Sequence, residues 1–299
     1  MSNNNIVKGV FLVGLGATSY GMLATFVKLA YNEGFTTAEV TSSQFIYGII
    51  GILLINLFQK LKNKNTAIKA SKKNIFQLML AGTSLGMTSV FYYLCVKYIN
   101  VSIAIVLLMQ TVWIGVLLEW FLDKKAPSKQ KTIAVIIVLI GTLLATNLLN
   151  SKAEIDWRGL LFGFLAACSF TTTMFTANKV ALGISSAQRS LYMLLGGAII
   201  VAGFAIFTQV TPFNMEIFMK WGIILALFGT IIPPMLMNSG FPHIGLGLGS
   251  IVSSLELPVS VMMAFFILNE NVILSQWFGV ILIVFAIVIM NINFSKIRK

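Results

Sequence analysis

The chain has 299 residues, of which 58% are hydrophobic and only 10% are charged. Soluble domains carry about 25% charged residues, so this composition excludes a soluble fold and predicts an integral membrane protein. The formal net charge of +12 would suit a nucleic-acid partner, but the basic residues concentrate in short connectors between apolar segments, which indicates membrane orientation instead.

Apolar segments follow one another along nearly the whole chain. A membrane-spanning helix needs roughly 20 apolar residues, whereas a strand of a membrane barrel needs about 10. Segments of the longer kind predict an all-α integral membrane fold with ten transmembrane helices and no room for a soluble domain. In chain order, the expected helices cover residues 6–30, 38–58, 75–96, 101–122, 132–149, 159–182, 190–208, 221–241, 246–268 and 275–293.

The two halves of the chain repeat each other. Residues 97–147 align with residues 242–291 at an offset of 145, with few or no gaps. The N-terminal parts align at an offset of 150, where residues 19–20 (SY) match residues 169–170 (SF). A self-match of this length indicates an internal repeat.

Each half holds five apolar segments, and five is an odd number. The second half must therefore enter the membrane from the opposite side. Inverted repeats of this kind are typical of secondary transporters, whose substrate sites lie near the bilayer midplane where the repeats meet. We expect two inverted five-helix repeats, residues 1–150 and residues 151–299.

Orientation follows from the basic residues near the membrane. With a cytoplasmic N-terminus, most of the 21 basic residues fall on the inner side, including the clusters within residues 60–73 and 124–131. Arg189 counts as an inner connector charge and Glu39 as an outer one. The prediction is a multi-pass protein of a bacterial inner membrane, with both the N- and C-termini cytoplasmic. The basic clusters expected on the inner side would also attract anionic lipid headgroups.

Three C-terminal motifs resemble the end of an EamA-type repeat of the drug/metabolite transporter superfamily. They are residues 255–259 (LELPV), residues 268–270 (LNE) and residues 276–283 (QWFGVILI). Residues 19–21 (SYG) resemble the start of the same repeat. The resemblance covers both halves, and it implies a ten-helix carrier that exports amino acids or other small metabolites.

The chain departs from that family pattern in several places. Leu257 intervenes where the family often has Glu directly before Pro, and Asn269 replaces the usual Gly. In the first half, Trp113 stands at the position that matches Pro258. These departures indicate that the two halves have specialised.

Glu256 is the leading candidate for function, because it lies near the middle of an expected helix. A charge at that depth costs at least ~2.5–3.5 kcal/mol by insertion scales. Glu256 is therefore the candidate for proton coupling, or for pairing with a cationic substrate group; the alternative is a protonated Glu that bonds a neighbouring helix. Ser253 lies on the same helical face, one turn earlier, and joins the substrate-binding candidates.

Three prolines inside the expected helices are candidate hinges. A proline within a helix removes the donor for the carbonyl four residues earlier, and such a carbonyl is tolerated only inside protein or in a wet cavity. Static kinks are the alternative interpretation. The hinge candidates are Pro233, Pro234 and Pro258, which would free the carbonyls of Gly229, Thr230 and Ser254.

The remaining substrate-binding candidates are polar or aromatic residues at the depth where the repeats should meet. Tyrosines near a helix end can instead anchor the membrane interface, which is the alternative for Tyr92. The candidates are Ser19, Tyr20, Tyr92, Gln110, Trp113, Phe170, Thr171, Asn178 and Asn238.

The expected function is export of small metabolites by alternating access. One acid among aromatic side chains suits amino acids, amines and apolar drugs alike. The alternatives are a channel-like or non-proton-coupled facilitator and a membrane-embedded lipid enzyme. With one histidine and no acids at ligand spacing, the sequence predicts no catalytic residues, no metal and no cofactor. The expected partners are a small-molecule substrate and the lipid bilayer, with no nucleic acid, and the protein is expected to be a monomer or a homodimer.

Overall fold

A computed structural model of the chain describes residues 3–62, 70–99, 101–147 and 156–291, which form helices joined by short turns. In the first half lie α1 (Asn3–Asn32), α2 (Thr37–Lys62), α3 (Lys72–Tyr98), α4 (Val101–Leu108), α5 (Thr111–Asp123) and α6 (Lys129–Ala145). In the second half lie α7 (Trp157–Lys179), α8 (Ser186–Thr208), the π-helix η2 (Phe218–Gly222), α9 (Ile223–Ala226), the π-helix η3 (Leu227–Ile231), α10 (Ile232–Ser253), α11 (Glu256–Leu268) and α12 (Leu274–Asn291). The expected all-α character is confirmed.

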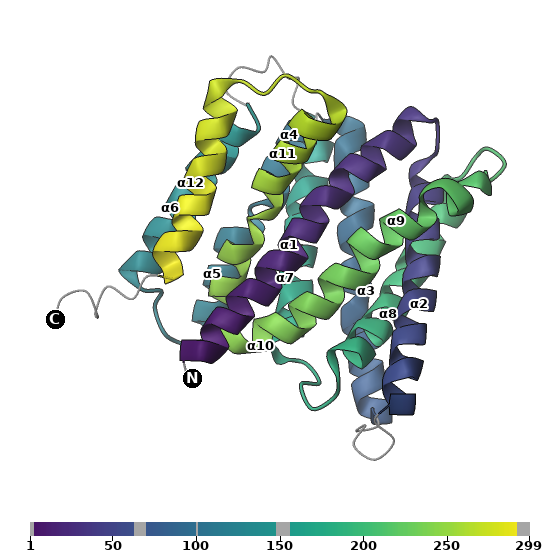
Figure 1. The fold of residues 1–299 in the computed structure, drawn as a ribbon, viewed down its shortest axis with the longest axis horizontal. Coiled ribbons are helices and arrows are strands. Elements are labelled where there is room, and N and C mark those ends of the chain that lie inside the picture. The colour runs from purple at the N-terminus through teal and green to yellow at the C-terminus, as the bar shows by residue number, and fades with distance from the viewer. Residues whose placement is uncertain (1–2, 63–69, 100, 148–155, 292–299) are drawn as a thin grey trace.

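Within the described residues, seven helical stretches are long and apolar enough to cross a membrane. One of them runs from Phe218 to Leu268, which is 51 residues and far longer than one crossing needs. Gly245 interrupts it with φ 77° and ψ 171°, a conformation that glycine adopts readily. Figure 1 shows the chain descending through α9 and the first part of α10, then rising again towards α11.

Two helices are broken at equivalent positions of the repeat. α4 gives way to α5 at residues 109–110, and α10 gives way to α11 at residues 254–255, which is the offset of 145 found in the sequence. The same offset relates the ends of these helices. Lys124 caps α5 in the left-handed region with φ 51°, and Asn269 caps α11 with φ 53°. The two halves therefore share backbone irregularities as well as helices.

Helix packing has the same twofold pattern. α3 packs against α8, and correspondingly α9 and η3 pack against α2. α1 packs against α10, as α7 packs against α3, and α1 packs against α11, as α7 packs against α4 and α5. The pairs α2 with α8 and α6 with α12 join equivalent elements of the two halves, and the contact of α5 with α10 joins the two broken helices. These larger interfaces therefore keep their pattern when the halves are exchanged.

Glycines allow the closest of these approaches. At the crossing of α3 and α8, a Cβ atom on Gly82 would overlap the Met193 carbonyl, and one on Gly196 would overlap the Met79 carbonyl. Small residues at helix crossings let backbones touch, which is how membrane helices gain packing energy without a hydrophobic driving force between them. The α3–α8 crossing thus fixes the spacing of the helices that enclose the centre of the molecule.

The two ends of the described chain lie at the same end of the helical bundle. Figure 1 shows α1 beginning and α12 ending there, while the α1–α2 and α11–α12 turns lie at the opposite end. Large apolar side chains such as Phe58, Phe121 and Phe207 remain exposed on the outside of the bundle. Exposed apolar surface on this scale fits a protein surrounded by lipid.

Candidate functional site

The centre of the molecule lies between α1 and α7, where two equivalent aromatic residues meet. The rings of Tyr20 and Phe170 pack edge to face with centroids 6.1 Å apart. These residues occupy the same position in the two halves, at the offset of 150. A contact between equivalent residues places this pair where the two repeats face each other.

Glu256 lies beside this pair, at the point where the helix restarts after its break. It begins α11, and its Oε2 atom is buried without a hydrogen-bond partner among the described residues. Its carboxyl lies within electrostatic range of the hydroxyls of Tyr20 and Tyr92. Gly21 lets α1 approach closely, since a Cβ atom there would lie 2.5 Å from the Glu256 carbonyl oxygen.

The equivalent place in the first half is filled differently. Thr111 matches Glu256 at the offset of 145, and Thr171 matches Gly21 at the offset of 150. The Oγ1 atoms of Thr111 and Thr171 lie 2.8 Å apart and form a buried hydrogen bond. In the first half, two hydroxyls at this position bond each other, whereas in the second half the carboxyl has an oxygen without a partner among the described residues. Comparison of the two halves could have indicated Thr111 from the sequence.

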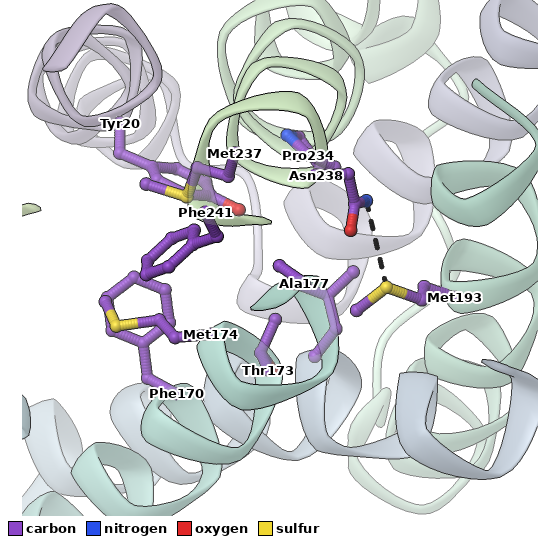
Figure 2. Close-up of a pocket in the computed structure, with 11 residues that line it drawn as sticks. Tyr20, Phe170, Thr173, Met174, Ala177, Met193, Pro234, Met237, Asn238 and Phe241 are labelled. Atoms are coloured by element: carbon purple, nitrogen blue, oxygen red, sulfur yellow. Dashed lines mark hydrogen bonds between the residues drawn. The ribbon is translucent and has the colours of Figure 1, made fainter. Parts of the chain in front are cut away.

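A small cavity of about 20 Å³ adjoins the central aromatic pair. Figure 2 shows Tyr20, Phe170 and Phe241 on one side of it, and Asn238 with Met193 on the other. The volume suffices for water but not for a metabolite. Its lining residues are Tyr20, Leu85, Phe170, Thr173, Met174, Ala177, Met193, Pro234, Met237, Asn238 and Phe241. The methionines among them were not expected from the sequence, because Met is as common in plain helix packing.

Asn238 presents an acceptor at this cavity. Its side chain is 3% exposed, and its Nδ2 atom donates to Ser190 Oγ at 2.9 Å and to Met193 Sδ at 3.8 Å. Its Oδ1 atom is buried and has no partner among the described residues. A buried acceptor in this state favours a bound donor.

Arg189 bonds the backbone of Asn238, although its position in the sequence predicted a connector charge. It is 2% exposed, so its assignment as a connector charge is wrong. Its guanidinium donates to the carbonyls of Thr176, Ala177, Val180 and Asn238 at distances from 2.6 to 3.0 Å. These bonds tie the end of α7 and the middle of α10 to the start of α8.

At the opposite end of the bundle, Glu39 is a buried acid that accepts hydrogen bonds from N–H groups. Its assignment as a connector charge is also wrong. It is 2% exposed and matches Arg189 at the offset of 150. Its carboxyl accepts from the backbone N–H of Thr36 at 2.8 Å, from the backbone N–H of Asn214 at 2.7 Å and from Gln209 Nε2 at 3.0 Å. A buried carboxylate here satisfies N–H groups near helix beginnings, whereas Arg189 satisfies carbonyls near helix ends.

Gln110 and Trp113 lie together at the break between α4 and α5. Gln110 Nε2 donates to the Val106 carbonyl at 2.9 Å, and Trp113 Nε1 donates to Gln110 Oε1 at 2.7 Å. The Gln110 amide therefore supplies a donor that the interrupted backbone lacks, and the Trp113 indole holds that amide in place.

The carbonyls expected to be freed by Pro233 and Pro258 differ from those in the structure. Because η3 is a π-helix, its hydrogen bonds span five residues, and Pro233 withholds a donor from Phe228 rather than from Gly229. Ser19 Oγ donates to that Phe228 carbonyl at 3.1 Å. The expectation for Pro258 is also wrong, because its target, the Ser254 carbonyl, accepts the Leu257 N–H at 3.1 Å.

Comparison with known proteins decides the family. The EamA-like transporter family model matches residues 7–147 and, a second time, residues 157–292. The chain belongs to the EamA-like transporter family. It is therefore a multi-pass membrane transporter of small solutes, and its two halves are EamA repeats. Members of the family are transporters rather than enzymes.

A solved crystal structure shares the fold of this EamA-like transporter. The two superpose with a TM-score of 0.76 over 96% of this chain and 97% of the other, at 13% sequence identity. Likeness at this identity concerns the fold alone. Among curated proteins, none matches the sequence.

The EamA fold brings only some of the expected site residues to the centre. Tyr20, Phe170 and Asn238 line the cavity, and Glu256 lies within electrostatic range of the hydroxyls of Tyr20 and Tyr92. Others have partners of their own: Asn178 Nδ2 donates to the Phe241 carbonyl at 2.7 Å, Ser253 Oγ donates to the Gly249 carbonyl at 2.9 Å, and Thr171 bonds Thr111. No group of three or more metal-ligating His, Cys, Asp or Glu side chains occurs in the part of the chain that the structure describes.

Proposed function

We propose that this EamA-like protein is a secondary transporter that exports small metabolites, either amino acids and related compounds or drugs, across the cytoplasmic membrane by alternating access. The observation that carries the proposal is the repetition of the broken helices at residues 109–110 and 254–255 on either side of the Tyr20–Phe170 contact. Broken helices at the meeting point of two repeats are the usual setting of a transporter's substrate site.

The proposed topology has ten crossings in two inverted five-helix repeats, residues 1–150 and residues 151–299. α4 with α5 forms one crossing, the stretch from η2 to Gly245 forms another, and the rest of α10 with α11 forms a third. Two observations support an inverted arrangement: the exchange of helix contacts between the halves, and the common end at which α1 begins and α12 ends. The proposed membrane is a bacterial inner membrane. The basic residues in the connectors favour a cytoplasmic position for the end of the bundle that holds both termini.

Alternating access requires movement from the present arrangement. The cavity of about 20 Å³ is too small for a metabolite. Phe241 is fully buried and packs against Gly249, so its ring fills the space between the two parts of α10. We therefore propose that α10 and α1 separate at this point during transport, with Pro233 and Pro234 as hinge positions in the adjoining π-helical stretch and Pro258 as a hinge position in α11.

The proposed substrate site comprises Glu256, Tyr20, Tyr92, Phe170 and Asn238. The other expected binding residues, which bond to neighbours in this arrangement, are proposed to contribute only after the helices move. Glu256 is also the proposed site of proton coupling, because its carboxyl has no cationic partner among the described residues and lies at the helix break.

Substrate identity and coupling can be tested in sequence. Growth protection of cells that express the protein, across a panel of toxic metabolites, identifies a transported compound. Uptake of that compound into liposomes is then measured with and without a pH gradient. We expect gradient-driven uptake by the native protein and by Glu270→Gln, an exposed acid that pairs with Lys28, and its loss in Glu256→Gln.

Two results would contradict the proposal. Gradient-driven uptake that survives in Glu256→Gln would remove the coupling role of this residue. Single-channel currents above the turnover of a carrier would favour a channel over alternating access.

A further inference from the structure

Two acceptor oxygens at the centre of the molecule lack donors from the described residues. They are Glu256 Oε2 and Asn238 Oδ1, and both are closed off from solvent. A buried acceptor without a donor loses the full hydration of that group, so native structures rarely leave one unfilled without a reason. A ligand for either atom must bring a hydrogen-bond donor.

Tyr20 connects the two acceptors. Its side chain lines the cavity together with Asn238, and its hydroxyl lies within electrostatic range of Glu256. Phe170 packs against its ring, and the hydroxyl of Tyr92 also lies within electrostatic range of the Glu256 carboxyl. An ammonium group is attracted to aromatic rings as well as to a carboxylate, so these side chains suit the same kind of ligand.

The buried cation next to the cavity and two lysines elsewhere on the helices already have partners. Arg189, the one nearest to Asn238, has all its described hydrogen bonds with backbone carbonyls. Lys28 pairs with Glu270, and Lys131 pairs with Glu119. Among the described residues that line the cavity, none is basic. A ligand that carries its own carboxylate would therefore bury that charge without a cationic partner, which is unfavourable.

The difference between the two repeats determines how many carboxyl groups lie at the centre of the molecule. In the first half, Thr111 occupies the position of Glu256 and is bonded to Thr171. The centre therefore offers one carboxyl and not a symmetric pair. A single carboxyl matches a ligand with one ammonium group at that point.

We infer that the central site takes small organic ammonium compounds without a carboxylate, in preference to amino acids. The Glu256 carboxylate pairs with the ammonium group, the rings of Tyr20 and Phe170 hold its apolar part, and Asn238 Oδ1 accepts a further donor. This inference rests on the proposed transport function and narrows its substrate class.

Binding to the purified full-length protein tests the inference, with probes that share one ring and differ in charge. The first set is benzylamine, benzyl alcohol and benzoate; the second is phenethylamine against phenylalanine; and n-butylamine against n-butanol adds an aliphatic pair. Binding is measured by calorimetry and by protection against thermal unfolding. We expect each amine to bind at least about tenfold more tightly than its neutral, anionic or zwitterionic counterpart, because a hydrogen bond to a charged group contributes that much.

Variants distinguish the contribution of the Glu256 carboxylate to binding from the effect of removing a carboxylate elsewhere in the protein. Glu256→Gln should weaken amine binding by about tenfold or more and leave benzyl alcohol unchanged. Glu270→Gln is the matched control, because it makes the same change in an exposed ion pair. If Glu256→Gln does not fold, Tyr20→Phe, which keeps the ring and removes the hydroxyl, should still lower amine affinity and leave benzyl alcohol unchanged.

The outcomes distinguish the inference from the proposed function. The inference is overturned if no amine binds more tightly than its counterparts, if phenylalanine binds as well as phenethylamine, or if Glu256→Gln or, should that variant not fold, Tyr20→Phe leaves amine affinity unchanged. Selective amine binding with no transport in liposomes would sustain the site and overturn the transport function. Transport of neutral or zwitterionic compounds in preference to amines would sustain transport and overturn the substrate class.

Discussion

Arg189 offers the sharpest test of the packing argument, because its guanidinium replaces hydrogen bonds that the backbone cannot make. It donates to Ala177 and Val180 at the end of α7, to Asn238 within α10, and to Thr176. Thr176 also accepts the backbone N–H of Val180 at 3.0 Å, so it keeps a donor if Arg189 is removed. In Arg189→Met, the buried carbonyls of Ala177 and Asn238 and the partly buried carbonyl of Val180 would be left without this donor.

The expected cost follows from those three groups. Each buried acceptor without a donor costs about 1–3 kcal/mol, which gives roughly 2–6 kcal/mol for the carbonyls of Ala177 and Asn238, and the partly buried Val180 carbonyl adds less. Removing the buried guanidinium relieves part of its desolvation, so we expect a net loss of about 2 kcal/mol or more from the free energy of unfolding. Arg158→Met is the control, because that arginine is half exposed and pairs with Asp156 at the surface; its loss should be about 1 kcal/mol or less.

A second substitution isolates one of the three bonds. Asn238 needs Arg189 because Pro242, four residues later in α10, has no N–H for its carbonyl. Pro242→Ala supplies that N–H. In the Arg189→Met background it should restore about 1 kcal/mol, and in the native background it should restore little, because the carbonyl is already bonded.

The assay is equilibrium unfolding of the native protein, the two single variants, their double variant and the Arg158→Met control in mixed detergent micelles, followed by circular dichroism, with thermal unfolding as a check on the order. The double variant of positions 189 and 242 is expected to lose less stability than the sum of the two single variants. The reasoning is refuted if Arg189→Met unfolds like the native protein, or if Pro242→Ala has the same effect in both backgrounds.

Three further outcomes follow from the described contacts. Gly196→Ala should separate α3 from α8 and lower the thermal unfolding temperature of the purified protein, whereas Gly203→Ala, which meets nothing within 4 Å, should not; equal effects would contradict the close crossing. Thr111→Val and Thr171→Val should each cost about 1 kcal/mol in unfolding, and the double variant should cost less than the sum, since one bond is shared; full additivity would argue against that bond. Ser19→Ala should leave the Phe228 carbonyl without its hydroxyl donor and increase amide hydrogen exchange in η3, and unchanged exchange there would remove the role given to this hydroxyl.

The sequence predicted the repeated framework because that framework depends on regular signals. Length and apolarity separate helices from connectors, and the offsets of 145 and 150 align equivalent residues. The helix breaks could not be read in the same way. Residues 109–110 (MQ) and 254–255 (SL) are compatible with a continuing helix, and the expected segments 101–122 and 246–268 ran straight through them. In an apolar helix, such a break depends on the partners that receive the freed backbone groups, which only the packed structure provides.

Arg189 and Glu39 show a second limit. Both lie near helix ends, where a count of charges along the chain assigns them to water. Their burial depends on backbone groups from distant segments: the end of α7 and the middle of α10 for Arg189, and the chain before η2 for Glu39. No local pattern encodes those partners. The repeat alignment does pair the two positions, and an acid opposite a base at equivalent sites was the available indication that neither is an ordinary surface charge.

The two halves share their backbone arrangement but carry different side chains at equivalent positions. The proposed transport mechanism needs both properties. Alternating access needs two similar halves, because each must be able to adopt the arrangement of the other. Substrate selection needs unlike groups at equivalent positions, since a symmetric centre would present every charge twice. Here the helix breaks coincide, while Thr111 stands opposite Glu256 and Phe170 opposite Tyr20. In the proposed mechanism, the repeated backbone therefore provides the movement, and the unpaired carboxyl of the second half selects the substrate.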